Sequence, residues 1–365
     1  MSGCFTARSR DLLRAAAAVD AKMDRTPLHK IAIIGAGSWG TALAIALGRS
    51  RQPHRLALWV HGADVLASLR TNRENAIYLP GIRVPDEVEI TGDMGAALSG
   101  ADVVLGVMPA MHARAVYAAM LPHLDRNAAR QTIFVSATKG LEHGSLARMS
   151  EVISEVVGRG FAPRVAVLSG PSFALEVARG DPAAVVIASS DRDVATAVQE
   201  EFSGPTLRLY TNHDVVGVEI GGAVKNVVAV AAGVCAGLGL GSNTVAALVT
   251  RGLAEMTRLA VALGGGRDTL VGLAGLGDLV LTATGALSRN RSVGVELGKG
   301  RPLAEVLSGM RMVAEGIGTT AATLALARRH GIEMPIATQM HAVLEEGRAP
   351  GEAIRELMER RLKQE

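Results

Sequence analysis

The sequence predicts an α/β fold: a doubly wound, mostly parallel β-sheet in the first half of the chain and an all-α second half. Between residues 30 and 214, short apolar runs alternate with helix-like segments. A glycine-rich turn follows the first run, and strand-like runs stop at about Asp214. Continuous β-branched and apolar runs that alternate with helices are typical of strands buried on both faces of a parallel sheet.

Seven strands are expected in the first half. Each run is short and rich in Val, Ile, Leu or Ala, as buried strands are. The expected strands lie within 31–35, 56–60, 102–109, 132–140, 165–171 and 183–189, with 206–212 as a last edge strand.

Helices are expected throughout the second half. Two clear helical segments are 243–264 and 318–331, and glycines that follow such segments suit helix C-caps. The longest apolar stretch, 227–241, contains several glycines and is shorter than the roughly 20 residues that span a bilayer. It therefore predicts a buried helix and loop, and no membrane span.

Composition argues against nucleic acid as a partner. The formal net charge is +3, but the first 30 residues carry six basic and three acidic side chains, so the remainder is neutral overall. Only 3% of the residues are aromatic. A nucleic-acid interface needs clustered positive charge on the fold itself, and often aromatic platforms for bases.

The N-terminal segment and the cysteines bear on location. Residues 1–29 are basic on balance, but they carry three acids and no continuous apolar core, unlike a targeting peptide. We expect a disordered extension, or a start site placed upstream of Met23. The two cysteines, Cys4 and Cys235, build no disulfide framework. A cytoplasmic location is the expectation.

The turn after the first strand has the spacing G-x-G-x-x-G. In "GAGSWG", Gly35 permits the tight turn, Gly37 lets the backbone approach a pyrophosphate, and Gly40 lets helix and strand pack closely. Phosphates are expected at the helix N-terminus, near Ser38 and Trp39. The alternative is a purely structural turn. The flanking strand and helix favour a Rossmann-like domain that binds a dinucleotide.

The second strand lacks the acid that usually holds a ribose 2′-hydroxyl. The sequence has Val60 and His61 at this point. Without that carboxylate a 2′-phosphate is not repelled, so NADP(H) is admissible as well as NAD(H). His61 is placed to face the phosphate, although a lone loop histidine is more often solvated.

Two polar residues interrupt an apolar helix at 219–233. Lys225 and Asn226 stand among Ile, Ala, Val and Gly. A lysine there can simply extend its amine to water. Alternatively, small neighbours leave room for a ligand, and a partly desolvated lysine has a pKa closer to the range useful for proton transfer.

Eight ordered segments from residue 30 onward resemble one enzyme family, the NAD(P)-dependent glycerol-3-phosphate dehydrogenases of the bacterial type. The segments are "GAGSWGTALA" (35–44), "NAIYLPG" (75–81), "SATKGLE" (136–142), "LSGPSFALEV" (168–177), "GGAVKNVVAVAAG" (221–233), "GLAGLGDLVLTAT" (272–284), "SRNRSVG" (288–294) and "VAEG" (313–316).

The resemblance implies reversible reduction of dihydroxyacetone phosphate to sn-glycerol 3-phosphate, which feeds phospholipid synthesis. Residues 1–29 lie outside the family pattern, as an extension. A dinucleotide-binding Rossmann domain is expected at 30–214 and an all-helical substrate-binding domain at 215–365. Ligand clefts form preferentially between domains. A homodimer is compatible with the sequence but not required by it.

Matching residue by residue makes Lys225 the proton donor and acceptor. Lys139 would contact both cofactor and substrate, and Asp278 would orient Lys225 or accept a substrate hydroxyl. Taken alone, Lys139 is an ordinary loop lysine and Asp278 a helix N-cap.

The segment "SGPSFA" would contribute to both ligands. Gly170 would offer a backbone N–H and Ser172 a hydroxyl to the substrate, with Ala174 beside the nicotinamide. Taken alone, the segment is a turn before a helix, with Ser172 as the cap.

A polar cluster at 287–294 would hold the substrate phosphate. The resemblance places phosphate beside Ser288, Arg289 and Asn290, with Arg289 also reaching the cofactor. Arginine suits this role because its planar fork donates two hydrogen bonds to phosphate and stays charged. Val313 and Glu315 would complete the cofactor contacts; alone, Glu315 is only a helix-start carboxylate.

Two alternatives remain open at this point. The chain could be a related dehydrogenase for another small hydroxy or keto acid, as in ketopantoate reductases or 6-phosphogluconate dehydrogenases. It could also be a protein that senses NAD(P) without chemistry. The nine histidines and two cysteines show no metal-ligand spacing.

Overall fold

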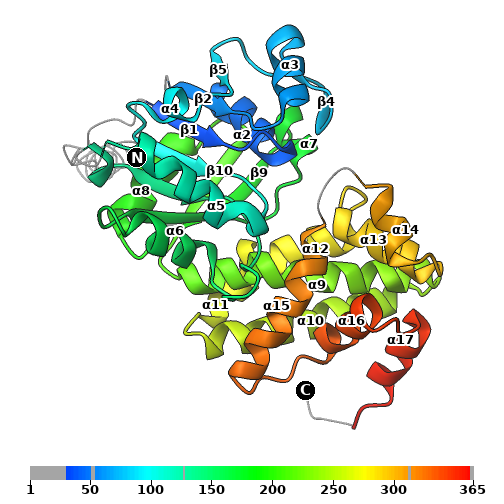
Figure 1. Cartoon of the computed structure of the whole chain (residues 1–365). Helices are drawn as coiled ribbons and strands as arrows, with labels where there is room; N and C mark the ends of the chain where they lie inside the picture. Colours follow the sequence, from blue (N-terminus) through cyan, green and yellow to red (C-terminus); the bar gives the residue numbers. More distant parts are fainter. Residues whose placement is uncertain (1–29, 51–53, 126–127, 311–313, 362–365) are drawn as a thin grey trace, which may run out of the picture.

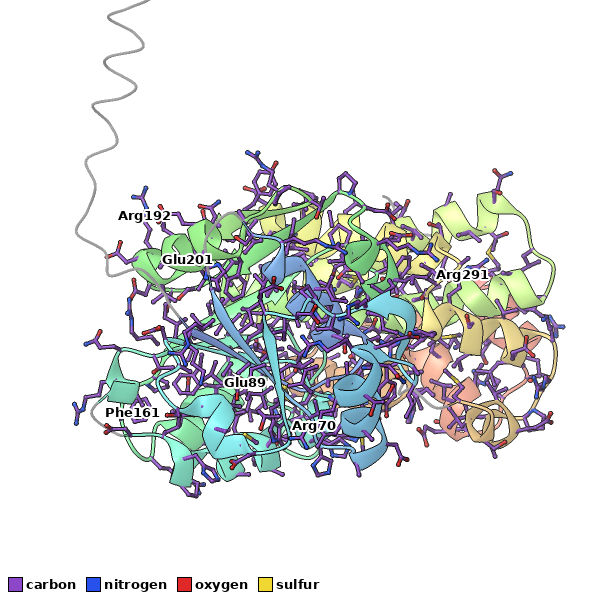
Figure 2. The ribbon with its side chains drawn as sticks, turned by 90° about the horizontal axis from the view of Figure 1, so that it is seen from above. Arg70, Glu89, Phe161, Arg192, Glu201 and Arg291 are labelled. Atoms are coloured by element: carbon purple, nitrogen blue, oxygen red, sulfur yellow. The ribbon has the colours of Figure 1, made fainter. Side chains whose placement is uncertain are left out.

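The computed structural model describes residues 30–50, 54–125, 128–310 and 314–361. Two predictions therefore lie outside the described residues: the extension at 1–29 and the cofactor contact of Val313. In Figure 1 the sheet domain occupies the upper left and the helical domain the lower right. The turned view in Figure 2 has Arg192 and Phe161 on the sheet domain and Arg291 on the helical domain.

An eight-stranded sheet forms the framework of the first domain. The strand order is β10-β9-β8-β7-β6-β1-β2-β5, so the order reverses on the two sides of β1. Strands pair in parallel throughout except at β8 and β9, which are antiparallel. The strands are β1 (Lys30–Ile34), β2 (Arg55–Trp59), β5 (Val88–Thr91), β6 (Val103–Gly106), β7 (Ile133–Ser136), β8 (Arg164–Ser169), β9 (Ala183–Ala188) and β10 (Leu207–Asn212).

All seven predicted strands are present, and β10 lies at an edge as expected. Several are shorter than their apolar runs, and β7 already ends at Ser136, which leaves Lys139 in the following loop. The prediction missed the edge strand β5, whose "VEIT" is too short to show a clear pattern. It also missed a hairpin of β3 (Glu74–Asn75) and β4 (Leu79–Arg83), which contains Pro80 and Gly81, both poor strand formers.

Helices cover both faces of the sheet. Successive residues of β1 accordingly pack alternately into the core on one face and the core on the other. Ile31 and Ile33 pack in the core that includes α2 and α8, whereas Ala32 and Ile34 pack with α5 and α6. The elements of this domain are α2 (Ser38–Gly48), α3 (Ala63–Asn72), α4 (Met94–Leu98), α5 (Ala110–Met120), η1 (Leu121–His123), η2 (Ala128–Arg130), α6 (Met149–Val157), α7 (Ala174–Arg179) and α8 (Arg192–Phe202).

The second domain is built around α9 (Val215–Gly237), which crosses the middle of the helical half in Figure 1. Of the described helices, α9 alone is long and apolar enough to cross a membrane, and 89% of its apolar window is buried inside the protein. The other elements are α10 (Ser242–Ala262), α11 (Arg267–Val271), the π-helical turn η3 (Leu273–Gly277), α12 (Asp278–Thr284), α13 (Arg289–Gly298), α14 (Leu303–Ser308), α15 (Glu315–Arg329), α16 (Pro335–Glu345) and α17 (Pro350–Met358).

Glycines let α13 lie directly against α9. A Cβ atom at Gly233 would overlap the carbonyl oxygen of Arg291, and one at Gly294 would overlap that of Val230. This backbone approach brings the N-terminus of α13, which carries the predicted phosphate cluster, beside the middle of α9.

Candidate active site

A buried carboxylate joins two lysines from different domains. Asp278 begins α12 and is 1% exposed. Its Oδ1 accepts a hydrogen bond from Lys225 Nζ, and its Oδ2 accepts one from Lys139 Nζ at 2.7 Å. Lys225 lies on α9, whereas Lys139 follows strand β7 of the sheet domain. Three predicted residues thus meet at the boundary between the domains.

The amine of Lys225 does not extend to bulk water. Its side chain is 7% exposed, and Nζ also donates to Thr282 Oγ1 at 2.8 Å. Burial lowers the pKa of Lys225 to about 7; the Asp278 carboxylate opposes this shift, and the charge of Lys139 adds to it. An amine with such a pKa exchanges protons readily near neutral pH.

Asp278 remains ionised in spite of its burial. Burial alone would raise the pKa of this carboxyl, but the Lys139 and Lys225 ammonium groups hold it below its usual value. The Asp278 side chain does not cap its helix, so the alternative of a plain N-cap is wrong. The π-helical turn η3 precedes Asp278, and such turns often occur at functional sites.

Sequence reasoning missed Thr282. Its hydroxyl contacts the amine of Lys225 and lies 3.4 Å from Asp278 Oδ1. The signal was present in "GDLVLT", because residues four apart lie on the same face of a helix.

The loop after β8 lies next to Lys139. The Gly170 carbonyl accepts a hydrogen bond from Lys139 Nζ at 2.8 Å and another from Ser172 Oγ at 3.0 Å. Helix α7 begins at Ala174 with Phe173 as its N-cap, so Ser172 is not the cap that the alternative required. Gly170 has φ +135°, and a Cβ there would come within 3.0 Å of Val185 Cα.

The phosphate cluster at the start of α13 is tied to α9 and α15. Asn290 Nδ2 donates to Asn226 Oδ1 at 2.9 Å, and Asn290 Oδ1 accepts the Gly316 N–H at 2.9 Å. Ser288 is the buried N-cap of α13 and accepts the Arg291 N–H at 3.2 Å. These bonds hold the first turn of α13 in a defined position.

Arg289 and Glu315 carry opposite charges at the starts of α13 and α15 and influence each other electrostatically. Desolvation by the surrounding protein lowers the pKa of Arg289, and the Glu315 carboxylate opposes that shift. Burial raises the pKa of Glu315 to about 6, although the Ala110 N–H and Arg289 favour its charged form. The Ala110 N–H lies 3.4 Å from Glu315 Oε1, a contact between the domains that the sequence did not reveal.

The glycine-rich turn connects β1 to α2, at the reversal in strand order. Gly35 has φ +118°, and a Cβ at Gly40 would overlap the Gly35 carbonyl oxygen. By contrast, nothing lies within 4 Å of a Cβ at Gly37, the N-cap of α2, which no side chain caps. A reversal in strand order is where open α/β sheets bind dinucleotides.

Ser38 and Trp39 begin α2, and Trp39 Nε1 is buried without a hydrogen-bond partner among the described residues. The open Gly37, the uncapped N–H groups and this free donor fit a pyrophosphate at the turn. His61 follows β2, is exposed, and lies 5.7 Å from the Trp59 ring between centroids. None of its described contacts joins it to the lysine cluster. Within the described ranges, no group of three or more His, Cys, Asp or Glu could hold a metal ion.

Comparisons with known proteins cover both domains. The model of the NAD-dependent glycerol-3-phosphate dehydrogenase N-terminus matches residues 30–195, and that of the C-terminus matches residues 214–355. A glycerol-3-phosphate dehydrogenase [NAD(P)+] from Koribacter versatilis is 58% identical over 91% of this chain and 98% of its own. A glycerol-3-phosphate dehydrogenase [NAD(P)+] from Acidobacterium capsulatum is 54% identical over 91% of this chain and 98% of its own.

A solved structure agrees. The crystal structure of glycerol-3-phosphate dehydrogenase from Coxiella burnetii superposes with a TM-score of 0.86 at 42% identity, covering 91% of this chain and 99% of that one. These matches include the sheet domain with its glycine-rich turn, the helical domain, and the residues of the lysine cluster between them. The chain belongs to the NAD-dependent glycerol-3-phosphate dehydrogenase family.

Proposed function

We propose that this protein catalyses the reversible NAD(P)H-dependent reduction of dihydroxyacetone phosphate to sn-glycerol 3-phosphate. The observation that carries the proposal is the Lys225–Asp278–Lys139 cluster, which is buried at the domain boundary. The printed names of the relatives agree with this activity. The same site would serve both directions, because Lys225 can release or accept a proton near pH 7.

The bound nicotinamide would supply or accept the hydride. Lys225 would deliver a proton to the carbonyl oxygen of the substrate during reduction and recover it during oxidation. Asp278 would hold the amine in place and stabilise its charged form. Lys139, fixed between Gly170 and Asp278, would contact the substrate and the cofactor from the sheet domain.

The remaining predicted contacts divide between the two ligands. Ser288, Arg289 and Asn290 would bind the substrate phosphate, with Gly170 and Ser172 on the opposite side. The cofactor would lie over the glycine-rich turn and reach the helical domain. Its proposed contacts are Gly35, Gly37, Ser38, Trp39, Gly40, His61, Lys139, Ala174, Arg289 and Glu315.

A direct assay tests the function. The purified protein should oxidise NADPH or NADH when dihydroxyacetone phosphate is added, followed by the loss of absorbance of the reduced nicotinamide. Running both cofactors at matched concentrations measures their relative preference. Ketopantoate and 6-phosphogluconate, the latter with the oxidised cofactors, test the alternative substrates. No turnover of dihydroxyacetone phosphate above background with either cofactor would refute the proposal. Turnover of an alternative substrate would then favour a related dehydrogenase, and no turnover of any substrate would favour a protein that only senses NAD(P).

Replacement of Arg289 by alanine should raise the KM for dihydroxyacetone phosphate by about 10- to 100-fold. A charged hydrogen bond to phosphate contributes roughly 1.5–3 kcal/mol, and tenfold corresponds to about 1.4 kcal/mol. Arg291→Ala, two residues further along the same helix, is the matched control and should change the KM less than twofold. Equal increases in both variants would mean that general positive charge, not a specific contact, attracts the substrate.

The wider setting of the reaction is also part of the proposal. We infer that the product feeds glycerophospholipid synthesis and that the enzyme works in the cytoplasm, as the few cysteines allow. We keep the domain division at 214/215, between the end of β10 at Asn212 and the start of α9 at Val215. A homodimer stays a prediction that light scattering of the purified protein can test.

A further inference from the structure

A second ion pair, whose carboxylate is buried, joins the two domains away from the lysine cluster. Glu219 lies on the first turns of α9, and its side chain is 4% exposed. Its Oε2 accepts hydrogen bonds from Arg148 Nη1 and Ser150 Oγ, both at 2.6 Å. Its Oε1 accepts the Ser150 N–H at 2.7 Å. A carboxylate of the helical domain thus caps α6 of the sheet domain.

The partners of Glu219 are tied to the loop that carries Lys139. Arg148 pairs with Leu141 in an isolated antiparallel bridge, and the Glu142 N–H donates to the Ala147 carbonyl at 2.9 Å. These bonds close the base of the segment 141–148. Lys139 lies two residues before the bridge, so the anchor at Arg148 also restrains the backbone next to Lys139.

The connections form a closed path through both domains. Along α9, Lys225 lies six positions after Glu219, about 9 Å of helix. From Lys225 the path continues to Asp278 and Lys139, and through the 141–148 segment back to Arg148 and Glu219. Loss of the link at Glu219 would leave the two lysines joined only through Asp278 in this path, so that each could shift relative to the other.

We propose that Glu219 is a positioning residue for the reaction, which holds α9 against the Lys139 loop so that Lys139 and Lys225 face one substrate at a fixed separation. Glu219 itself touches neither lysine in the described contacts. This inference rests on the proposed function. Small displacements at a reacting centre cost large factors in rate, because the reacting atoms must meet in a narrow range of geometries.

The test compares two buried carboxylates that both cap a helix. Glu255 is 3% exposed and accepts the Ile336 and Ala337 N–H groups at the start of α16, within the helical domain. Glu219→Ala and Glu255→Ala should both lower the melting temperature. Only Glu219→Ala should lower kcat/KM for dihydroxyacetone phosphate, by about 10-fold or more. Glu255→Ala should change it less than twofold.

Two further measurements separate positioning from loss of structure. The Kd for NADPH, from fluorescence quenching, should change less than kcat/KM in Glu219→Ala, because most of the proposed cofactor contacts, including the glycine-rich turn, lie in the sheet domain. Arg148→Ala and the double variant should lose no more activity than Glu219→Ala alone, since Arg148→Ala removes one of the three hydrogen bonds that Glu219→Ala removes together. Additive losses in the double variant would overturn the proposal.

The outcomes distinguish this inference from the proposed function. A wild-type protein without activity on dihydroxyacetone phosphate refutes the function. An active wild type with equal kcat/KM in Glu219→Ala and Glu255→Ala refutes only the role of Glu219. If Glu219→Ala does not fold, Glu219→Gln decides, because it keeps the volume and can still accept the Ser150 N–H. It should lose at least threefold in kcat/KM, and wild-type activity would overturn the proposal.

Discussion

Replacement of Lys225 by alanine should lower kcat by about 10³-fold or more. General acid–base catalysis contributes typically 10²- to 10⁴-fold, and the described contacts place one amine beside Asp278 and Thr282 to supply it. A factor of 10³ corresponds to about 4 kcal/mol in the activation free energy. Steady-state turnover with saturating dihydroxyacetone phosphate measures the effect.

Binding of the cofactor provides the control for this variant. The glycine-rich turn lies in the sheet domain, so the Kd for NADPH should stay close to the wild-type value in Lys225→Ala. A small primary amine such as ethylamine should restore part of the activity by occupying the space left by the side chain. Near-normal turnover without added amine would remove Lys225 from the proposed mechanism.

The pKa of Lys225 also sets a dependence of rate on pH. Reduction needs the protonated amine, so its kcat should fall as the pH rises through about 7. Oxidation of glycerol 3-phosphate needs the neutral amine, so its kcat should rise through the same range. Opposite slopes in the two directions identify one group that acts as acid and as base. Parallel profiles would assign the titration to another residue.

Replacement of Asp278 by asparagine should be the second most damaging change. The variant removes the charge that holds the pKa of Lys225 up, so this pKa should fall further below its usual value. At pH 7 fewer molecules would then carry the proton that reduction needs. We expect a loss of about 10²-fold in kcat at pH 7, and a fall in the rate of reduction that begins at lower pH than in the wild type.

The same variant should lose stability in a way that depends on pH. Removal of one partner from a buried ion pair costs about 3–5 kcal/mol, which corresponds to a melting temperature lower by on the order of 10 °C. Between the depressed folded-state pKa of Lys225 and its ordinary value of 10.5, the unfolded chain binds more protons than the folded one. The free energy of unfolding therefore rises with pH by the same slope in both proteins in this window, so the deficit should stay constant there. It should shrink with rising pH only below about 7, between the lower folded-state pKa of Lys225 in the variant and that in the wild type.

Glu255→Gln is the control for Asp278→Asn. It neutralises another buried carboxylate of the helical domain, one whose pKa burial raises to about 7. Because this carboxyl is already partly neutral at pH 7, the change should cost little stability, and kcat should remain within twofold. If Asp278→Asn also kept wild-type kcat across the pH range, the carboxylate would have only a structural role.

The strands of the sheet could be predicted because their patterns are local. Buried parallel strands are continuous apolar runs, and the "GAGSWG" turn carries its own steric reason in Gly35 and Gly40. Strand β5 and the β3–β4 hairpin could not be predicted in this way. All three strands are short, and β4 contains Pro80 and Gly81 and is exposed at several positions. Their pairing depends on neighbours elsewhere in the chain.

In the candidate site, too, some features could be predicted from the sequence and others could not. The residue types at Lys139, Lys225, Asp278 and Arg289 were evident in the sequence, and so were the unusual polar positions within apolar segments. The sequence alone did not reveal that Asp278 accepts from both lysines, that Asn290 links Asn226 to Gly316, or that Glu219 caps α6. The segments that supply these partners are tens of residues to more than a hundred residues apart.

The sequence by itself determined the two-part architecture, the glycine-rich turn and the identity of the polar residues, since each depends on the covalent chain and its immediate neighbours. Only the tertiary structure decided which of those residues meet and how their protons are held. The lowered pKa of Lys225 is the clearest case, because it arises from burial and from the charges of Asp278 and Lys139. Those two residues come from segments that only the folded protein brings to α9.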